Sequence, residues 1–275
     1  MTYIREIREP DRVKEIFRVA RSAWGMEKPE SFISDLLNAI RFHGGLVLGA
    51  YEKDELIGFL FGVIGRRGNR YYLYSHMTGV SEQRKYSGIG YRLKLRQREW
   101  AARQGYELVA WTFDPLMSLN GSFNIRKLGA ISRTYLVNFY GTMTDRLNYG
   151  VETDRFIAEW WTARERRADS FNPEEYPGAV ITSETPAGFR KIEDIRIPHG
   201  DRLTVEIPFD YVSIKGTSLE SAIEWRLKTR KVFRTLFRRG YTAVSFTSSG
   251  GRSYYLFDRQ LPRGSGIGSR VFDVE

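Results

Sequence analysis

The sequence predicts a mixed α/β fold, or α+β fold, in which helices flank a mixed sheet. Short apolar runs rich in β-branched and aromatic residues alternate with amphipathic helical patterns over residues 1–145. Their order is strand, two helices, three antiparallel strands, helix, strand, helix, strand. A shorter series of strands around one helix follows residue 200, which predicts a smaller C-terminal α/β extension.

The first elements are a strand over residues 3–7 and a helix that begins at Pro10. In this helix apolar residues recur at three- and four-residue steps, so we expect one face to be buried. A second helix begins near Pro29 and ends at Gly44, because glycine commonly terminates a helix.

The central elements follow from apolar runs and their connections. Runs at 46–51 and 56–64 are separated by a short charged segment, which predicts a hairpin. A third strand at 71–80 leads through a glycine-containing turn into a long helix at 88–103. The remaining elements of this region are a strand at 108–113, a short helix at 120–128 and a strand at 134–140.

Composition shifts predict the domain organisation. Residues 1–162 form the first domain, the breaker-rich segment 163–199 is a linker, and 200–262 form a C-terminal α/β unit. Residues 263–275 are expected to be a flexible tail. The C-terminal unit is predicted to contain strands at 203–207, 211–214, 242–246 and 253–257, and a helix at 218–239.

The composition narrows the class of protein. The chain has 275 residues, 41% of them hydrophobic, which is enough for one large domain or two smaller ones. It has no cysteine, which excludes disulfides and thiolate metal sites. No signal-peptide core and no run of ~18 apolar residues is present, so we expect a cytoplasmic protein that makes no membrane contact.

The net charge of +10 arises from 43 Lys and Arg against 33 Asp and Glu. Such a balance favours anionic ligands or polyanions. A nucleic-acid binder, a phosphate-rich cofactor site and a solvated surface would all produce it, so its distribution along the chain has to decide.

The junction between the third strand and the long helix carries the clearest chemical signal. It contains Arg84 and Lys85, followed by Gly88 and Gly90. The first amides of a helix point outward unpaired, the helix dipole favours an anion there, and glycines allow a phosphate to approach the backbone. The junction therefore predicts a phosphate site, with a plain glycine entry into the helix as the alternative.

A strand, then Lys85-x-x-Gly88-x-Gly90, then a basic amphipathic helix resembles the pyrophosphate-binding signature of the GNAT (Gcn5-related N-acetyltransferase) superfamily. The order of elements over 1–145 is similar to the GNAT fold, and 124–130 resembles its later helix-to-strand motif. The resemblance implies acetyl-CoA or another acyl-CoA as cofactor. It also implies transfer of an acetyl or other short acyl group, succinyl included, to a primary amine of a small molecule or amino acid.

The resemblance also assigns site residues. In the family the strand before the loop splays from its neighbour, and its last backbone groups bind the pantetheine arm, which corresponds here to Met77 and the residues after it. The implied cofactor-binding residues are Thr78, Gly79, Val80, Arg84, Lys85, Tyr86, Ser87, Gly88, Ile89, Gly90 and Asn124.

Two departures from the family pattern matter. Lys85 and Tyr86 stand where the family usually has Gln or Arg and then often Gly, which leaves a phosphate loop with altered packing. Ile125 occupies the place of the tyrosine that often acts as general acid, so the sequence assigns no proton donor.

Acyl transfer needs a neutral amine, an oxyanion stabiliser and a proton for the leaving thiolate. His76 is the candidate base, because an imidazole with an ordinary pKa near ~6.5 suits proton abstraction near neutral pH. Tyr74, two residues earlier on the same strand face, is the second candidate. Both residue types also occur as packed strand residues, and Asp114 is interpreted either as an acceptor-facing group or as a helix cap.

The sequence contains no motif for metal binding or for serine-hydrolase chemistry. The three histidines lack metal-ligand spacing, so we expect no metal, and Ser87 is not in the Gly-x-Ser-x-Gly elbow of serine hydrolases. The rival function is a basic nucleic-acid or acidic-protein binding module on an inactive GNAT scaffold. It rests on residues 225–239, where Arg226, Arg230 and Arg234 lie in a segment without acids. No stacking motif accompanies them, so nucleic acid is the less expected partner. The acceptor and the oligomeric state, a homodimer included, stay open.

Overall fold

The computed structural model describes residues 2–24, 30–85, 87–143, 148–163, 165–261 and 266–272. It contains two compact units, residues 1–111 and 112–275. The division falls inside the strand β5 (Leu108–Phe113) and not at the boundary after residue 162 that the sequence suggested. The two units are therefore described separately.

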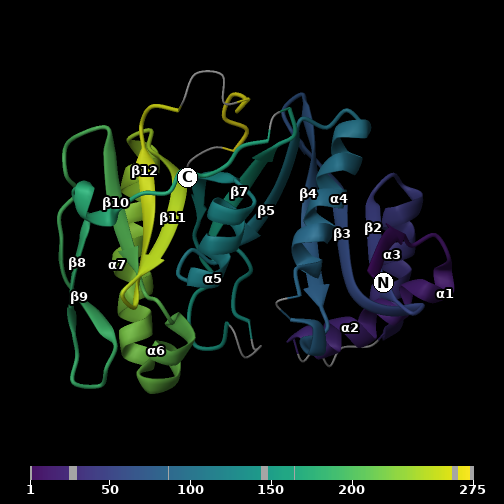
Figure 1. Cartoon of the computed structure of the whole chain (residues 1–275), viewed down its shortest axis with the longest axis horizontal. Coiled ribbons are helices and arrows are strands. Elements are labelled where there is room, and N and C mark those ends of the chain that lie inside the picture. The colour runs from purple at the N-terminus through teal and green to yellow at the C-terminus, as the bar shows by residue number, and fades with distance from the viewer. Residues whose placement is uncertain are drawn as a thin grey trace. The chain divides into compact units, whose positions relative to one another are not determined.

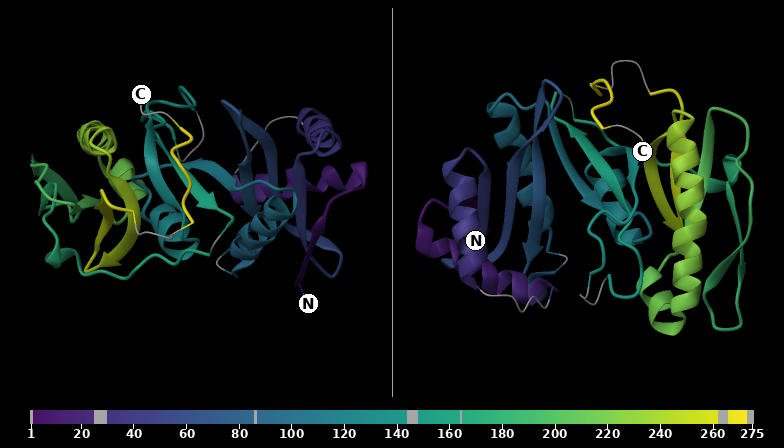
Figure 2. Two further views of the ribbon diagram at one scale, coloured as in Figure 1. Left: turned by 90° about the horizontal axis from the view of Figure 1, so that it is seen from above. Right: turned by 180° about the vertical axis from the view of Figure 1, so that it is seen from behind.

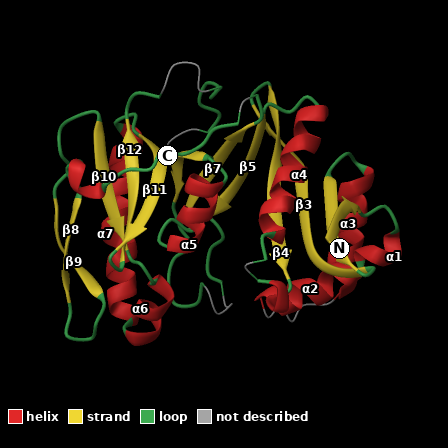
Figure 3. Ribbon diagram, in the orientation of Figure 1, coloured by secondary structure: helices red, strands yellow, loops and turns green. Residues whose placement is uncertain are grey.

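Unit 1 contains a sheet in the order β1-β2-β3-β4-β5, with helices on both faces (Figures 1 and 3). Neighbouring strands are antiparallel except β4 and β5, which are parallel, so the sheet is mixed as predicted. Its elements are β1 (Thr2–Glu6), α1 (Pro10–Val13), α2 (Glu15–Trp24), α3 (Glu30–Phe42), β2 (Leu46–Glu52), β3 (Glu55–Arg67), β4 (Arg70–Val80), the 3-10 turn Glu82–Arg84 and α4 (Ile89–Arg103).

The helices of unit 1 bury opposite faces of this sheet. Helices α2 and α3 pack on one face against β2, β3 and β4, and α4 packs across β2, β3 and β4 on the other, as the left view of Figure 2 shows. The core beneath α1, α2 and α3 joins Ile16 and Leu37 to Phe59 and Phe61 of β3. The apolar spacing of α2 thus serves burial, as expected from its period.

In unit 2 the paired strands follow the order β7-β6-β11-β12-β10, and β8 and β9 form a separate two-stranded hairpin. Helix α7 runs along the strands of the unit, in front of them in the right view of Figure 2. Its elements are α5 (Ser118–Gly121), the π-helix Ser122–Lys127, β6 (Ile131–Leu136), β7 (Arg155–Trp161), the 3-10 turn Pro173–Glu175, β8 (Val180–Glu184), β9 (Arg190–Ile195), β10 (Arg202–Ile207), α6 (Tyr211–Thr217), α7 (Leu219–Arg238), β11 (Thr242–Ser249) and β12 (Arg252–Asp258).

Three predictions for this region were wrong. Residues 211–214, expected as a strand, begin α6, because the Asp210 side chain accepts a hydrogen bond from the Ser213 amide and caps a helix. The expected linker contains the β8-β9 hairpin. Part of the expected flexible tail, 266–272, lies against β6: Phe272 is buried, and Arg133 donates to the carbonyl oxygens of Gly268 and Ser269.

Helix α7 begins and ends almost where the sequence predicted. Its buried side includes Trp225, Val232 and Phe233, and the Phe233 ring packs on Phe156 of β7 and Tyr255 of β12. An aromatic core therefore joins α7 to the sheet of unit 2. Within the described residues, no helix combines the length and the hydropathy needed to cross a bilayer.

Candidate active site

Strand β4 is irregular at the candidate base. Phe61 of β3 pairs with Met77 and Gly62 pairs with Ser75, so His76 is an extra residue that has no partner in the β3 register. This is a β-bulge, which bends a strand and redirects its side chains. The bulge places the imidazole of His76 next to the Phe61 ring, with ring centroids 5.3 Å apart.

The same strand separates from its other neighbour just before the bulge. Within unit 1, β4 and β5 pair only through Leu73 with Val109 and Tyr74 with Ala110, although β4 continues to Val80. The rest of β4 keeps its ladder to β3. One edge of β4 therefore leaves the β5 ladder after Tyr74, and its backbone groups can serve another extended chain.

The loop after β4 is held in place from three sides. The Ser81 amide donates to the Ile57 carbonyl oxygen at 2.9 Å, and the Glu82 amide donates to Ser22 Oγ of α2 at 3.1 Å. The Arg84 guanidinium pairs with Glu52 at the end of β2, with Nε 3.1 Å from Oε2. Residues 81–84 are thus fixed before any ligand is present, which lowers the entropic cost of binding.

Helix α4 begins at a glycine with a left-handed backbone. Gly88 is its N-cap at φ 80°, and no side chain caps the helix. A Cβ atom built on Gly88 would meet nothing within 4 Å, and one on Gly90 would meet only Val80 Cγ2 at 3.8 Å. The first amides of α4 are therefore approachable, and both the glycine geometry and the helix dipole suit an anion there.

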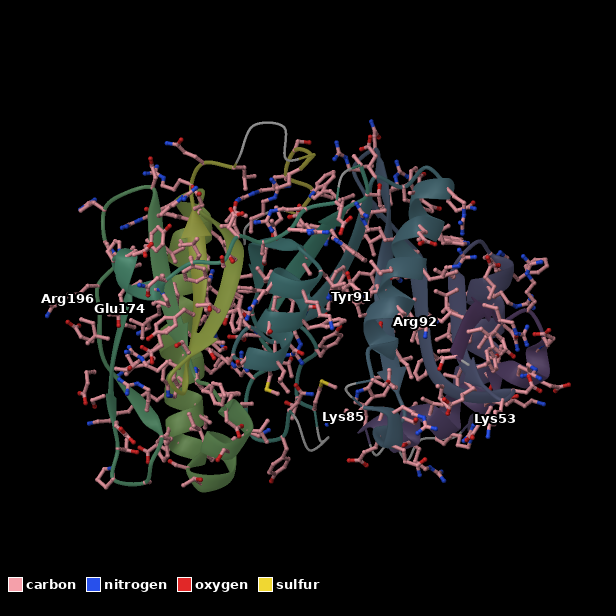
Figure 4. The ribbon with its side chains drawn as sticks, in the orientation of Figure 1. Lys53, Lys85, Tyr91, Arg92, Glu174 and Arg196 are labelled. Carbon is pink, nitrogen blue, oxygen red and sulfur yellow. The ribbon has the colours of Figure 1, made fainter. Side chains whose placement is uncertain are left out.

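The charged residues of the loop differ in their surroundings. Lys85 is exposed in the turn before Gly88 (Figure 4), close in sequence to the helix start. Arg92, also labelled there, donates from Nη2 to the Thr2 carbonyl oxygen at 2.9 Å and so anchors α4 to β1. Arg84 is paired with Glu52, and Lys85 is the predicted cation nearer in sequence to Gly88.

His76, the predicted base, is an exposed residue whose imidazole is flanked by two aromatic rings. The imidazole of His76 lies beside the rings of Phe61 and Tyr74, with centroids 5.3 and 6.0 Å away. Desolvation by the surrounding chain lowers the pKa of His76 below its usual value. A lower pKa keeps the ring neutral, and so able to accept a proton, at neutral pH.

The remaining predicted residues of unit 1 have distinct environments. Thr78 and Val80 are half-buried, and Ser87 is exposed. The Ile89 side chain is buried, so only its backbone is suited to a ligand. Gly79 lies under two rings, because a Cβ there would come within 2.8 Å of both Phe59 and Trp24.

The other predicted residues lie elsewhere. Tyr86 is outside the described residues. Asn124 lies on the π-helix of unit 2, where its side chain is buried beside Ile125. Asp114 accepts from the Leu116 amide in the turn before α5, but the N-cap of α5 is Met117 and no side chain caps that helix, so the cap prediction was wrong. Asp114 instead forms a buried ion pair with Arg226.

One residue of unit 1 was missed by the sequence analysis. Lys94 of α4 is only 3% exposed, and its Nζ lies 2.8 Å from Ser75 Oγ and 3.7 Å from the ring centroid of Trp111. Ser75 and Trp111 follow directly after the two pairs that join β4 and β5. Lys94 thus lies at the point where the two strands part, and burial lowers the pKa of Lys94 well below its usual value.

Helix α7, on which the rival function rests, uses two of its arginines for ion pairs within unit 2. Arg226 is 1% exposed and pairs with Asp114, with Nη2 2.5 Å from Oδ2. Arg230 pairs with Asp154, with Nε 2.8 Å from Oδ2, and also with Glu152. The expectation that these two arginines form a polyanion-binding face is therefore wrong. Their neighbouring carboxylates come from other segments, which local sequence could not show.

Comparison of structures identifies the fold. No protein-family model matches the sequence, and no curated protein matches it either. The yncA protein of Salmonella typhimurium, whose structure contains its cofactor acetyl-CoA, aligns with a TM-score of 0.50 and 15% identity, covering 62% of this chain and 99% of its own. Because unit 1 ends at residue 111, this match extends into unit 2.

Other solved structures give similar values. A GNAT-family protein of Desulfovibrio desulfuricans aligns at TM-score 0.48 and 19% identity, covering 59% of this chain and all of its own. The ribosomal-protein-S18-alanine N-acetyltransferase of Escherichia coli aligns at 0.48 and 12% identity, covering 62% and 100%. On the alignment with the yncA protein, the chain has the GNAT acetyltransferase fold over about 60% of its length, as predicted, and carries a further region beyond it.

Proposed function

We propose that this GNAT-fold protein is an acyl-CoA-dependent N-acyltransferase that acts on a primary amine of a small molecule or amino acid. One observation carries the proposal: the edge of β4 that leaves β5 after Tyr74 is followed, after the connection 81–88, by the uncapped start of α4. An extended arm ending in a pyrophosphate requires a free strand edge followed by an anion site. Unit 1 has both, in that order.

The residues fit the coenzyme at its phosphate end. The amides at Ile89 and Gly90 and the open space beside Gly88 would hold the pyrophosphate, with Lys85 adding positive charge. Arg84 would act mainly through its pair with Glu52, by fixing the loop. When bound, an acyl-CoA supplies the activated thioester carbonyl that the amine attacks.

Strand β4 would supply the remaining contacts. The backbone of Met77, Thr78 and Val80 would hydrogen-bond the pantetheine arm and polarise the carbonyl, and removing one such preorganised donor typically costs ~2.7–4 kcal/mol of barrier. His76, redirected by the bulge, would take a proton from the ammonium group of the acceptor, directly or through water, and the neutral amine would then attack the thioester carbonyl. Tyr74 would line the same face. The prediction that Asn124 binds the cofactor stays a proposal.

The rival function has less support. A polyanion-binding face on α7 would need exposed, uncommitted arginines, and Arg226 and Arg230 are buried or paired. The acyl group, acetyl or a short dicarboxylic one such as succinyl, is left to experiment. We further propose that the protein acts in the cytoplasm.

Calorimetric titration with acetyl-CoA and succinyl-CoA tests the proposal. Gly88→Glu places a carboxylate at the start of α4, where it should abolish binding by repulsion. Gly105→Glu is the matched control, because Gly105 follows the other end of α4, has the same φ of 80°, and a Cβ atom added to it would likewise meet nothing within 4 Å. We expect micromolar binding by the wild type and by Gly105→Glu only. No binding by the folded wild type would overturn the proposal.

A further inference from the structure

Unit 2 contains a basic cavity that the proposed acyl transfer does not use. It has a volume of about 230 Å³ and is lined by Pro198, His199, Gly200, Arg239, Tyr241 and Arg259. These residues come from one edge of the unit, where α7 ends, β10 and β11 begin and β12 ends. No acidic residue lines the cavity.

The two arginines that line the cavity, Arg239 and Arg259, differ from other arginines of unit 2 in their interactions. Arg202 pairs with Asp258 and Arg252 pairs with Glu206. Within the described residues, by contrast, the guanidinium groups of Arg239 and Arg259 have neither an ion pair nor a side-chain hydrogen bond. The Arg259 guanidinium lies over the Tyr241 ring, 5.4 Å from its centroid. Its planar face is thus packed while its N–H groups stay available to a ligand.

The walls of the cavity are held by hydrogen bonds. Tyr241 is buried, and its hydroxyl donates to the Gly200 carbonyl oxygen. The Arg259 amide donates to the Asp201 carbonyl oxygen at 2.9 Å. The Tyr241 side chain and the Arg259 backbone are therefore positioned before any ligand arrives.

Two features that would repel an anion are neutralised. The last carbonyls of a helix carry partial negative charge, but here those of Leu236 and Phe237 accept from the amides of Tyr241 and Gly240. Of the two carboxylates adjacent in sequence to lining residues, Asp258 pairs with Arg202, and Asp201 keeps its charge but accepts from Gln260 Nε2 at 2.7 Å. The local charge of the cavity is positive.

We propose that this cavity binds the phosphate group of a small phosphomonoester. Arg239 and Arg259 can each donate two N–H groups, and His199 offers one more, which suits the three terminal oxygens of a phosphomonoester better than the two of a carboxylate. The volume leaves room for a small organic group, and it is below the ~300–1,000 Å³ typical of sites for drug-sized ligands. Its concave shape favours a small ligand over a nucleic-acid strand.

The test is calorimetric titration of the full chain with inorganic phosphate, glycerol phosphate, acetate and a single-stranded oligonucleotide, in phosphate-free buffer. The variant Arg239→Gln, Arg259→Gln removes both guanidinium groups. The double variant Arg167→Gln, Arg238→Gln is the control. Both of these residues are exposed and lie outside the cavity, and the control variant loses the same two positive charges as the test variant. Gly88→Glu separates this cavity from the start of α4, which also attracts phosphate.

We expect phosphate and glycerol phosphate to bind the wild type, the control and Gly88→Glu alike, and acetate to bind more weakly. Loss of the two arginines should reduce phosphate affinity at least about tenfold, because it removes the charge-assisted hydrogen bonds that both guanidinium groups would donate. Unchanged phosphate binding in Arg239→Gln, Arg259→Gln, or none in the wild type, would overturn the proposal. Tighter, variant-sensitive binding of the oligonucleotide would assign the cavity to nucleic acid instead.

Discussion

The side chain of Lys94 lies 2.8 Å from Ser75 Oγ inside unit 1, and within the described residues no carboxylate balances this buried amine. Lys94 Nζ also donates to the side-chain oxygen Oε1 of Gln97 at 3.4 Å and lies over the Trp111 ring. Burial without a counter-charge favours the neutral amine, which is why the pKa of Lys94 is lowered.

Lys94→Met should change the pH dependence of stability. The unfolded chain binds a proton on Lys94 up to pH ~10.4, whereas the folded chain loses it at the lowered pKa. Between these two values the unfolded state holds more protons, so the free energy of unfolding of the wild type rises with pH. Lys94→Met should abolish this rise and be the more stable protein at the low end of the range. Urea denaturation from pH 6 to 10 measures both, with exposed Lys231→Met as control. An unaltered slope in Lys94→Met would contradict a lowered pKa.

Gly79→Ala should destabilise the end of β4. The added methyl group would lie within 2.8 Å of the rings of Phe59 and Trp24, which pack edge to face and cannot both retreat. Overpacking of this kind typically costs about 1–3 kcal/mol. Thermal denaturation measures the loss. Gly90→Ala is the control, because its methyl group would meet only Val80 at 3.8 Å and should not destabilise the protein.

The sequence could predict the β4-α4 junction because its signals are local. A strand-like apolar run, a pair of glycines and an amphipathic helix can each be recognised from a few residues, and their order is similar to that of the GNAT fold. The burial of Lys94 and Arg226 could not be predicted in this way. Lys94 lies among charged residues of a basic helix, and Arg226 gains its partner Asp114 from a distant segment. The β8-β9 hairpin was missed because its residues are polar and flanked by prolines, which is also the composition of a linker.

Arg226→Met tests how far α7 depends on its buried charges. Removing the guanidinium leaves Asp114 buried with only the more distant Arg155, whose Nη1 lies 3.8 Å from Asp114 Oδ2. Breaking a buried pair by removing one partner typically costs about 3–5 kcal/mol. Chemical denaturation should show that loss. Arg238→Met removes an exposed arginine of the same helix and should have little effect, and an equal loss in both variants would assign it to the helix in general.

His76→Gln tests the proposed base. The glutamine cannot take a proton, so the rate of acyl transfer should fall about 10²–10⁴-fold while acyl-CoA binding at the start of α4 is retained. In the wild type, kcat/KM should rise with pH through a pKa below ~6.5, because desolvation lowers the pKa of His76 and the neutral ring is the active form. The variant should lose this acidic limb. Tyr74→Phe is the companion measurement: if it lowers the rate of acyl transfer by this much and His76→Gln does not, the base is Tyr74, and the bulge at His76 then serves to shape β4 alone.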